Sequence, residues 1–228
     1  MKWNGIFPRL FTKNDISFST EYQNYLKSYA APNMKSKIVD QSFVVFDTET
    51  TGFDLSASRL LSLGAVMVQN NSFHINQSLS IAFQQSVRHT EDAVAIHGIV
   101  TNEQIGLAEE EVIKIFYDYI GSSVIVGHHT AFDIQMVQYC GKKYGFGPIL
   151  NPTLDTSYLA KRLDNPYNPM QQNPKDYSLD ALCERFDIIA KARHTADGDA
   201  YLTALVFMKI VKQFELKGVF YLKDILKK

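Results

Sequence analysis

A short apolar run that leads into two carboxylates is the feature that most constrains the fold of this chain. Ser42 to Phe46 has the β-branched and aromatic content of a strand, and its unbroken apolar character is typical of a strand buried on both faces. Because side chains alternate along a strand, Asp47 and Glu49 project from the same face. The run therefore predicts a covered strand that ends at a pair of acids.

The order of the other elements indicates the fold class. Apolar stretches at 60–68 and 72–83 are joined by the hairpin-type pair Asn70-Asn71, which predicts a meander with the first strand. From Asp92 onward the apolar period becomes that of helices. Strands followed by mixed strands and helices predict an α/β domain with a mixed central β-sheet flanked by helices. The later predicted elements are strands at 124–126 and 153–155 and helices at 109–120, 130–144, 158–163, 178–186 and from 197 or 198 to about 214.

Three regions are predicted along the chain. Residues 1–40 mix aromatic and polar residues and contain one short predicted helix, Ser19 to Tyr29. We expect an N-terminal arm or cap there, whose role the sequence does not indicate. Residues 41–214 form the predicted main domain, and residues 215–228 form a short C-terminal tail.

Composition limits the class of protein and its compartment. With 228 residues, of which 46% are hydrophobic and 21% charged, a packed globular fold is expected. The net charge of −1 means that any binding to a polyanion depends on a local cluster. Cys140 and Cys183 form neither a zinc pattern nor a disulfide framework. No apolar stretch has the length of a membrane span, and the start lacks a secretory signal, so we expect a cytoplasmic protein without a membrane partner.

Two acids at the end of a buried strand have two interpretations. Neighbouring carboxylates repel each other, and a divalent cation with a preference for oxygen ligands, such as Mg²⁺ or Mn²⁺, relieves that repulsion. Acids at strand ends also occur for solubility or as caps of the next loop. From Asp47 and Glu49 alone, both interpretations stay open.

Two later segments favour the metal interpretation. Gly127 to Asp133 follows a core strand and places Asp133 in the first turn of a predicted helix, and Arg193 to Ala200 places His194 five residues before Asp199. The helix dipole also explains an acid at either position as a cap. Four acids in this combination are poorly explained by capping. Asp199 is the preferred ligand because an apolar helix follows it, whereas Asp197 is expected to cap that helix.

These segments resemble the motifs of the DnaQ-like (DEDDh) 3′→5′ exonucleases, typified by the epsilon proofreading subunit of bacterial DNA polymerase III. The resemblance covers about residues 43–210 and implies a ribonuclease H-like fold. It also implies two divalent cations, Mg²⁺ or Mn²⁺, with His194 as general base and four acids as ligands. The motifs are Asp47 to Gly52, His128 to Asp133, and His194 with Asp199; the implied ligands are Asp47, Glu49, Asp133 and Asp199.

The implied chemistry is consistent with these residue types. In two-metal hydrolysis of a phosphodiester, one cation lowers the pKa of the attacking water and a second, about 3.5–4 Å away, stabilises the leaving oxygen. An unperturbed histidine has a pKa of about 6.5, so His194 suits the acceptance of the water's proton near neutral pH.

Substrate contacts are expected from residues beside the motifs. Phe53 is either an apolar wedge against terminal bases or a loop aromatic packed on the core, and His97 is expected to shape the pocket. Relatives usually carry asparagine where this chain has His129, and often glutamate where it has Ser62. The full predicted substrate set is Thr48, Thr50, Phe53, His97 and His129. Asp155 and Asp180 are expected to make local hydrogen bonds. We expect surface positions or satisfied polar contacts for His74, His89 and His128. The basic pairs are expected to be solvated surface or phosphate contacts; they are Lys142-Lys143, Lys161-Arg162 and Lys191/Arg193.

The function predicted from these residues is release of nucleoside 5′-monophosphates from 3′ ends of DNA, single-stranded or frayed. RNA trimming by the same residues is the main alternative. A second alternative is a haloacid dehalogenase-type phosphatase with Asp47 as nucleophile, which leaves His194 no role. A third is a non-catalytic nucleic-acid-binding module. A polymerase partner is possible, but the short tail lacks the long segment by which an epsilon subunit joins its polymerase.

Overall fold

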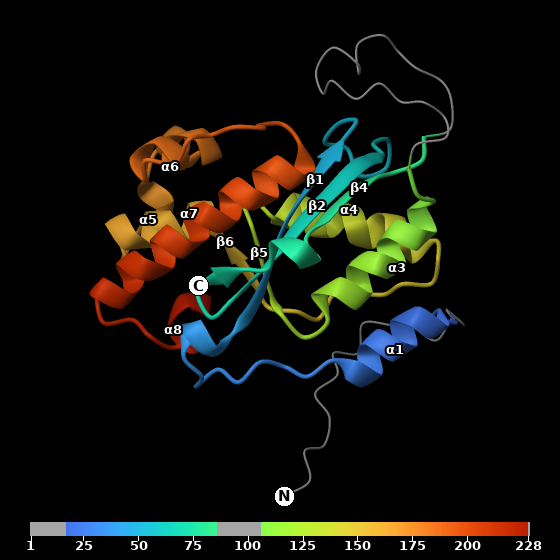
Figure 1. Ribbon diagram of the computed structural model, residues 1–228, viewed down its shortest axis with the longest axis horizontal. Coiled ribbons are helices and arrows are strands. Elements are labelled where there is room, and N and C mark those ends of the chain that lie inside the picture. The colour runs from blue at the N-terminus through green and yellow to red at the C-terminus, as the bar shows by residue number, and fades with distance from the viewer. Residues whose placement is uncertain (1–16, 86–105, 228) are drawn as a thin grey trace, which may run out of the picture.

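A mixed β-sheet forms the centre of the protein. The computed structural model describes residues 17–85 and 106–227 (Figure 1). Within these residues the sheet has the strand order β3-β2-β1-β5-β6, with β4 also paired to β2. β1 is antiparallel to β2 and parallel to β5, and β5 is parallel to β6, which confirms the predicted mixed sheet. The strands are β1 (Ser42–Thr50), β2 (Leu60–Gln69), β3 (Ser72–Phe73), β4 (Leu79–Ala82), β5 (Val124–Gly127) and β6 (Thr153–Asp155).

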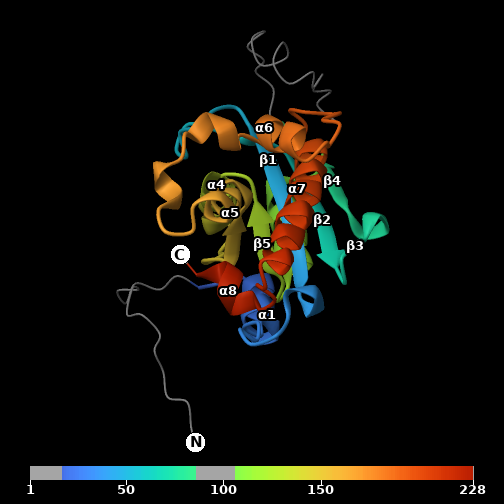
Figure 2. The ribbon, with the colours of Figure 1, turned by 90° about the vertical axis from the view of Figure 1, so that its left-hand side faces the viewer.

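Helices cover both faces of this sheet. α7 runs along β1 and β2 on one face (Figure 2), and it packs there with α5 and α6. α3 and α4 cover the other face. The helices are α1 (Thr20–Ser28), α3 (Glu109–Ile120), α4 (Ala131–Lys142), α5 (Thr156–Asp164), α6 (Leu179–Arg185), α7 (Ala196–Leu216) and α8 (Leu222–Leu226); short 3-10 turns are η1 (Ile38–Asp40), η2 (Ile75–Gln77), η3 (Pro169–Gln171) and η4 (Pro174–Tyr177).

Alternate residues of β1 enter the two cores. Phe43 and Val45 pack in the core under α7, whereas Val44 and Phe46 pack in the core under α3 and α4. All four are at most 3% exposed, as the unbroken apolar run predicts. The alternation also determines which face each residue beyond Phe46 meets.

The strands differ in two places from the sequence prediction. β1 continues through the acidic residues to Thr50, because β2 pairs with it along that whole length. The predicted strand 72–83 is interrupted by η2, so that β3 and β4 pair separately with β2. The predicted turn is present, since Asn70 and Asn71 have φ values of 52° and 55°, as in a type I′ hairpin.

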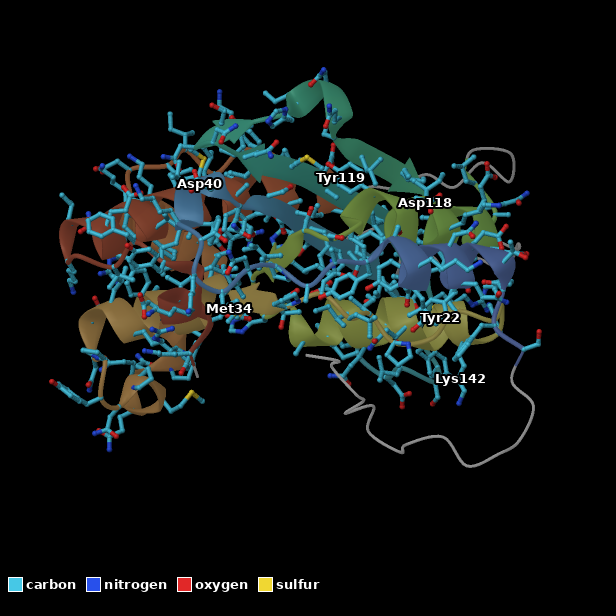
Figure 3. The ribbon with its side chains drawn as sticks, turned by 90° about the horizontal axis from the view of Figure 1, so that it is seen from below. Tyr22, Met34, Asp40, Asp118, Tyr119 and Lys142 are labelled. Carbon is cyan, nitrogen blue, oxygen red and sulfur yellow. The ribbon has the colours of Figure 1, made fainter. Side chains whose placement is uncertain are left out.

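Segments from both ends of the described chain pack on the domain. Tyr22 and Tyr25 of α1 are 2% and 3% exposed, and α1 lies beside α3 in the view from below (Figure 3). Tyr22 Oη donates to Pro148 O at 2.8 Å, and Tyr25 Oη donates to Asn151 Oδ1 at 2.6 Å. Residues 34–38 pair with residues 220–223, which precede and begin α8. The division into regions 1–40, 41–214 and 215–228 stays a prediction.

None of the helices in the described residues combines the length and the hydropathy of a membrane span.

Candidate metal centre

β1 presents its acids to the face that α7 covers. Asp47 and Glu49 have the same parity as Phe43 and Val45, so they continue the side of β1 that faces α7. In the β1–β2 register, Asp47 lies opposite Gly64. A carboxylate donated by the start of α7 can therefore meet both acids.

Asp199 is that carboxylate. It lies in the first turn of α7 and is 8% exposed. Oxygens of Asp47, Glu49 and Asp199, one from each residue, lie within 4.8 Å of one another. Three hard oxygen donors at this separation suit a divalent cation such as Mg²⁺ or Mn²⁺, so the residues present fit the predicted metal.

Capping of α7 differs from the prediction. Thr195 is the N-cap, and its Oγ1 accepts from Gly198 N at 3.2 Å. Asp197 was predicted to cap this helix, but it lies exposed within the first turn. A hydroxyl at the N-cap position satisfies the same backbone donors as a carboxylate, which explains why the sequence did not distinguish the two.

Gly64 allows α7 to approach the sheet, and the sequence analysis did not single it out. A Cβ added at Gly64 would lie closer than 3.0 Å to backbone atoms of Ala196 and Asp197, a distance that real Cβ atoms essentially never show. The missing side chain thus brings the first turn of α7, with Asp199, against β1 and β2. A glycine inside an apolar strand is the sequence signal for such a close approach.

Asp133 reaches the site from the opposite face. It lies in the first turn of α4 and is 7% exposed, as predicted for an acid near a helix N-terminus. Its Oδ1 accepts from Thr48 N at 3.1 Å and from Thr48 Oγ1 at 2.5 Å. Thr48 has the parity of Val44 and Phe46, so this contact holds Asp133 to the α4 side of β1. Asp133 therefore lines the cavity beside the three-carboxylate cluster without belonging to it.

The acids perturb one another. Burial, followed by the charges of Asp133, Asp199 and Glu49, raises the pKa of the Asp47 carboxyl to about 9. Burial also raises the pKa of Asp133 to about 6. The positive charge of Arg193 opposes these effects, because it lowers the pKa of Asp47. A bound divalent cation stabilises ionised carboxylates most where their mutual repulsion opposes simultaneous ionisation.

A cavity of about 550 Å³ opens beside these acids. The Phe53 side chain at its edge is 90% exposed, and its ring centroid lies 5.6 Å from that of Phe132. The interpretation of Phe53 as a ring packed on the core is therefore wrong, and its role as an apolar wedge against terminal bases stays a prediction. The residues that line the cavity include Asp47, Thr48, Glu49, Thr50, Phe53, His128, His129, Phe132 and Asp133.

The remaining predicted site residues have varied surroundings. Thr50 Oγ1 donates to Gly52 O at 2.8 Å, which shapes the turn after β1. His129 is exposed, with φ of 57°. His194 is exposed on the loop before α7, with φ of 62°. His97 and His89 lie outside the described residues.

His128 is more buried than a surface residue. Its Nδ1 lies 2.9 Å from Thr156 Oγ1, while its Nε2 is buried with no hydrogen-bond partner among the described residues. Burial and the neighbouring His129 lower the pKa of His128 to about 3, so the imidazole is neutral at physiological pH. The prediction of a fully satisfied polar residue is wrong for Nε2.

Local hydrogen bonding was predicted for Asp155 and Asp180 and is confirmed for both. Asp155 caps α5 and accepts from Tyr158 N at 3.0 Å. Asp180 accepts from Arg193 Nε at 2.6 Å. Arg193 was predicted to be solvated surface or a phosphate contact, but it is half-buried and also pairs with Asp199.

Comparison with known proteins identifies the family. A family model, RNase_T, described as "Exonuclease", matches residues 44–207, which is most of the chain and includes every described acid of the site. The chain belongs to the RNase_T exonuclease family. The resemblance to the DnaQ-like exonucleases is thereby confirmed, and a phosphatase of the haloacid dehalogenase type is excluded.

The proteins similar to this chain include components of bacterial DNA polymerase III. The DNA polymerase III subunit epsilon of Aquifex aeolicus is 31% identical over 185 residues, which cover 81% of this chain and 87% of the relative. The PolC-type DNA polymerase III of Halalkalibacterium halodurans is also 31% identical over 185 residues, but this chain spans only 12% of its length.

Solved structures confirm the fold. E. coli exonuclease I in complex with a dT13 oligonucleotide superposes with a TM-score of 0.66 at 16% identity, over 78% of this chain and 42% of the other. A zinc-bound form of the exonuclease I complex with single-stranded DNA gives a TM-score of 0.65 at 17% identity, over 81% of this chain and 42% of the other. These likenesses establish the ribonuclease H-like architecture of the RNase_T exonuclease described here.

Proposed function

We propose that this exonuclease is metal-dependent and releases nucleoside 5′-monophosphates one at a time from the 3′ end of DNA, preferably single-stranded or frayed. The observation that carries the proposal is the convergence of Asp47, Glu49 and Asp199 beside an open cavity. The similarity to an epsilon subunit supports the choice of DNA and of 3′→5′ polarity.

Each group has a role in this proposal. Divalent cations held by Asp47, Glu49 and Asp199, with Asp133 alongside, would supply an activated water and stabilise the leaving oxygen. His194 accepts the proton of the attacking water, from the loop that enters α7 at the same end as Asp199. Thr48 holds Asp133 in place through its two hydrogen bonds.

The aromatic pair at the cavity supports the preference for a free strand end. Phe53 is 90% exposed and is backed by Phe132, so one of its faces is open to a base. Stacking of a base on an aromatic ring is tolerant of sequence and needs an unpaired base. A terminal nucleotide stacked on Phe53 would have its phosphodiester beside the acids.

The test compares two neighbouring acids of α7. The substrate is a 5′-labelled single-stranded DNA oligonucleotide with Mg²⁺ or Mn²⁺. We expect a ladder that shortens from the 3′ end, with nucleoside 5′-monophosphate as the product. Asp199→Asn should lower the rate at least about 100-fold because a metal ligand is lost. Asp197→Asn, in the same turn but exposed, is the matched control and should stay within a few-fold of wild type.

Two outcomes would contradict the proposal. Wild-type rates in Asp199→Asn would refute the metal-ligand assignment. Faster trimming of an RNA oligonucleotide of the same sequence would overturn the choice of DNA and favour the RNA-trimming alternative. Whether the exonuclease acts within a polymerase assembly is a separate question, which co-purification with a polymerase subunit would answer.

A further inference from the structure

Arg193 links two carboxylates on different helices. Its Nε donates to Asp180 Oδ1 at 2.6 Å and its Nη2 to Asp180 Oδ2 at 3.3 Å, so both oxygens of Asp180 are engaged. Its Nη1 forms an ion pair with Oδ1 of Asp199. The Arg193 side chain is only 19% exposed and that of Asp199 only 12%. The contact with Asp180, whose side chain is 64% exposed, is the forked form of the arginine–carboxylate pair, whereas the contact with Asp199 is a single ion pair in a poorly exposed setting.

The loop that carries Arg193 needs such an anchor. Asp187, Ala192 and His194 all have positive φ, at 56°, 57° and 62°, a conformation that costs a non-glycine residue about 1 kcal/mol or more. Thr195 Oγ1 donates to Ala192 O at 2.8 Å, which closes the loop onto the start of α7. Arg193 ties the same loop to α6 through Asp180, which lies in the first turn of that helix.

We infer that Arg193 is a positioning residue of the metal centre. It holds the Asp199 carboxylate in the orientation that the cluster with Asp47 and Glu49 requires, and it fixes the backbone that carries His194. The first role concerns cation binding alone, and the second rests on the proposed function. A neighbouring group that orients a metal ligand in this way sets the affinity of the site for the metal.

The charge of Arg193 supports this role. One oxygen from each of three carboxylates lies within 4.8 Å of the other two, and the guanidinium is a positive charge in direct contact with one of these carboxylates. It therefore offsets part of their repulsion. Removal of Arg193 should disorder Asp199 as well as remove a charge.

The chain offers a matched control. Arg185 of α6 pairs with both oxygens of Asp164 at 2.7 Å, with the same forked chemistry. Neither Arg185 nor Asp164 contacts the acids of the metal centre through any described hydrogen bond or ion pair. A purely structural arginine–aspartate pair, which joins the ends of α5 and α6, is thus available for comparison.

The experiment measures Mn²⁺ binding to the full chain by titration calorimetry. We expect Arg193→Gln to weaken Mn²⁺ binding about 10- to 100-fold, the usual cost of losing a group that orients a metal ligand. Arg193→Lys keeps the positive charge but removes the paired hydrogen bonds of the guanidinium to Asp180, and Asp180→Asn weakens the same contact. Both variants should therefore lose an intermediate amount of Mn²⁺ affinity. Arg185→Gln should bind Mn²⁺ as wild type does. At saturating Mn²⁺, kcat on a DNA oligonucleotide should fall in Arg193→Lys while KM stays within about twofold.

The outcomes separate this inference from the proposed function. An Mn²⁺ dissociation constant in Arg193→Gln equal to or below that of wild type would overturn the positioning role, with Arg193→Lys as the test if the glutamine variant does not fold. If wild type binds Mn²⁺ but degrades no nucleic acid, the proposed function fails while the binding comparison still decides the role of Arg193. A wild-type chain that binds no Mn²⁺ would refute both.

Discussion

Substitution of Gly64 by alanine tests whether the close contact between β2 and α7 builds the site. The added Cβ would meet backbone atoms of Ala196 and Asp197 at less than 3.0 Å, and backbone has no rotamer by which to move aside. Ordinary carbon contacts are about 3.5–4.0 Å, so the first turn of α7 must shift by roughly 1 Å. Overpacking of this kind costs about 1–3 kcal/mol. At about 2–4 °C per kcal/mol for a chain of this size, the melting temperature should fall by about 2–12 °C.

The effect of Gly64→Ala on activity should exceed its effect on stability. A shift of about 1 Å in a group that positions the reaction can cost about 100-fold in rate. Because Asp199 lies in the displaced turn, we expect a loss of that order in kcat/KM on single-stranded DNA, together with weaker Mn²⁺ binding. Scanning calorimetry, metal titration and a nuclease assay on the same preparation measure the three effects.

Gly141→Ala is the control for Gly64→Ala. A Cβ at Gly141 would meet side-chain atoms of Phe146 and Ile113 at 3.1 Å and 3.2 Å, in the core under α3 and α4. Those side chains can adjust by a few tenths of an ångström, so stability should change while activity persists. A folded Gly64→Ala variant with more than about a third of wild-type kcat/KM would refute the argument.

Two further predictions concern single side chains at the cavity. Burial and the neighbouring acids raise the pKa of Asp47 to about 9 in the folded chain, whereas an unperturbed aspartate has a pKa near 3.8. Without metal, this residue's contribution to stability therefore falls as pH rises across that interval. In the presence of a metal chelator at pH 8, the Asp47→Asn variant should have a higher melting temperature than wild type. An equal or lower melting temperature would contradict the raised pKa of Asp47. Phe53→Ala should raise KM for a single-stranded oligonucleotide about 5- to 100-fold, since stacking contributes about 1–3 kcal/mol per base. Tyr167→Ala, equally exposed at 91%, is its control, and a similar KM change in both would exclude specific stacking.

Much of the fold follows from local patterns in the sequence. The predicted helices at 19–29, 109–120 and 178–186 are present, with Ser19 and Ser178 as N-caps and Gly121 as the C-cap of the helix that begins at Glu109. Boundaries failed where they depend on a distant partner. β1 extends to Thr50 because β2 pairs along it, and no feature of β1 alone sets that length.

The site was predictable in composition but not in arrangement. The acids were recognisable from their motifs, yet their division between the two faces of β1 depends on which helix covers each face. Asp133 on the α4 side and Asp199 on the α7 side follow from that packing. Arg193 was indistinguishable from solvent-exposed cations because its two partners come from helices that the sequence does not place side by side.

The chain order of the three clustered carboxylates has a consequence during biosynthesis. Asp47 and Glu49 belong to the first described strand of the chain, whereas Asp199 belongs to a helix that follows all the strands of the described residues. A ribosome-bound chain that has not yet added this helix contains two of the three proposed ligands, and elongation adds the third last. On the proposed assignment of the ligands, a nascent or prematurely terminated product that lacks α7 would have no nuclease activity, and activity would arise only once α7 has been synthesised.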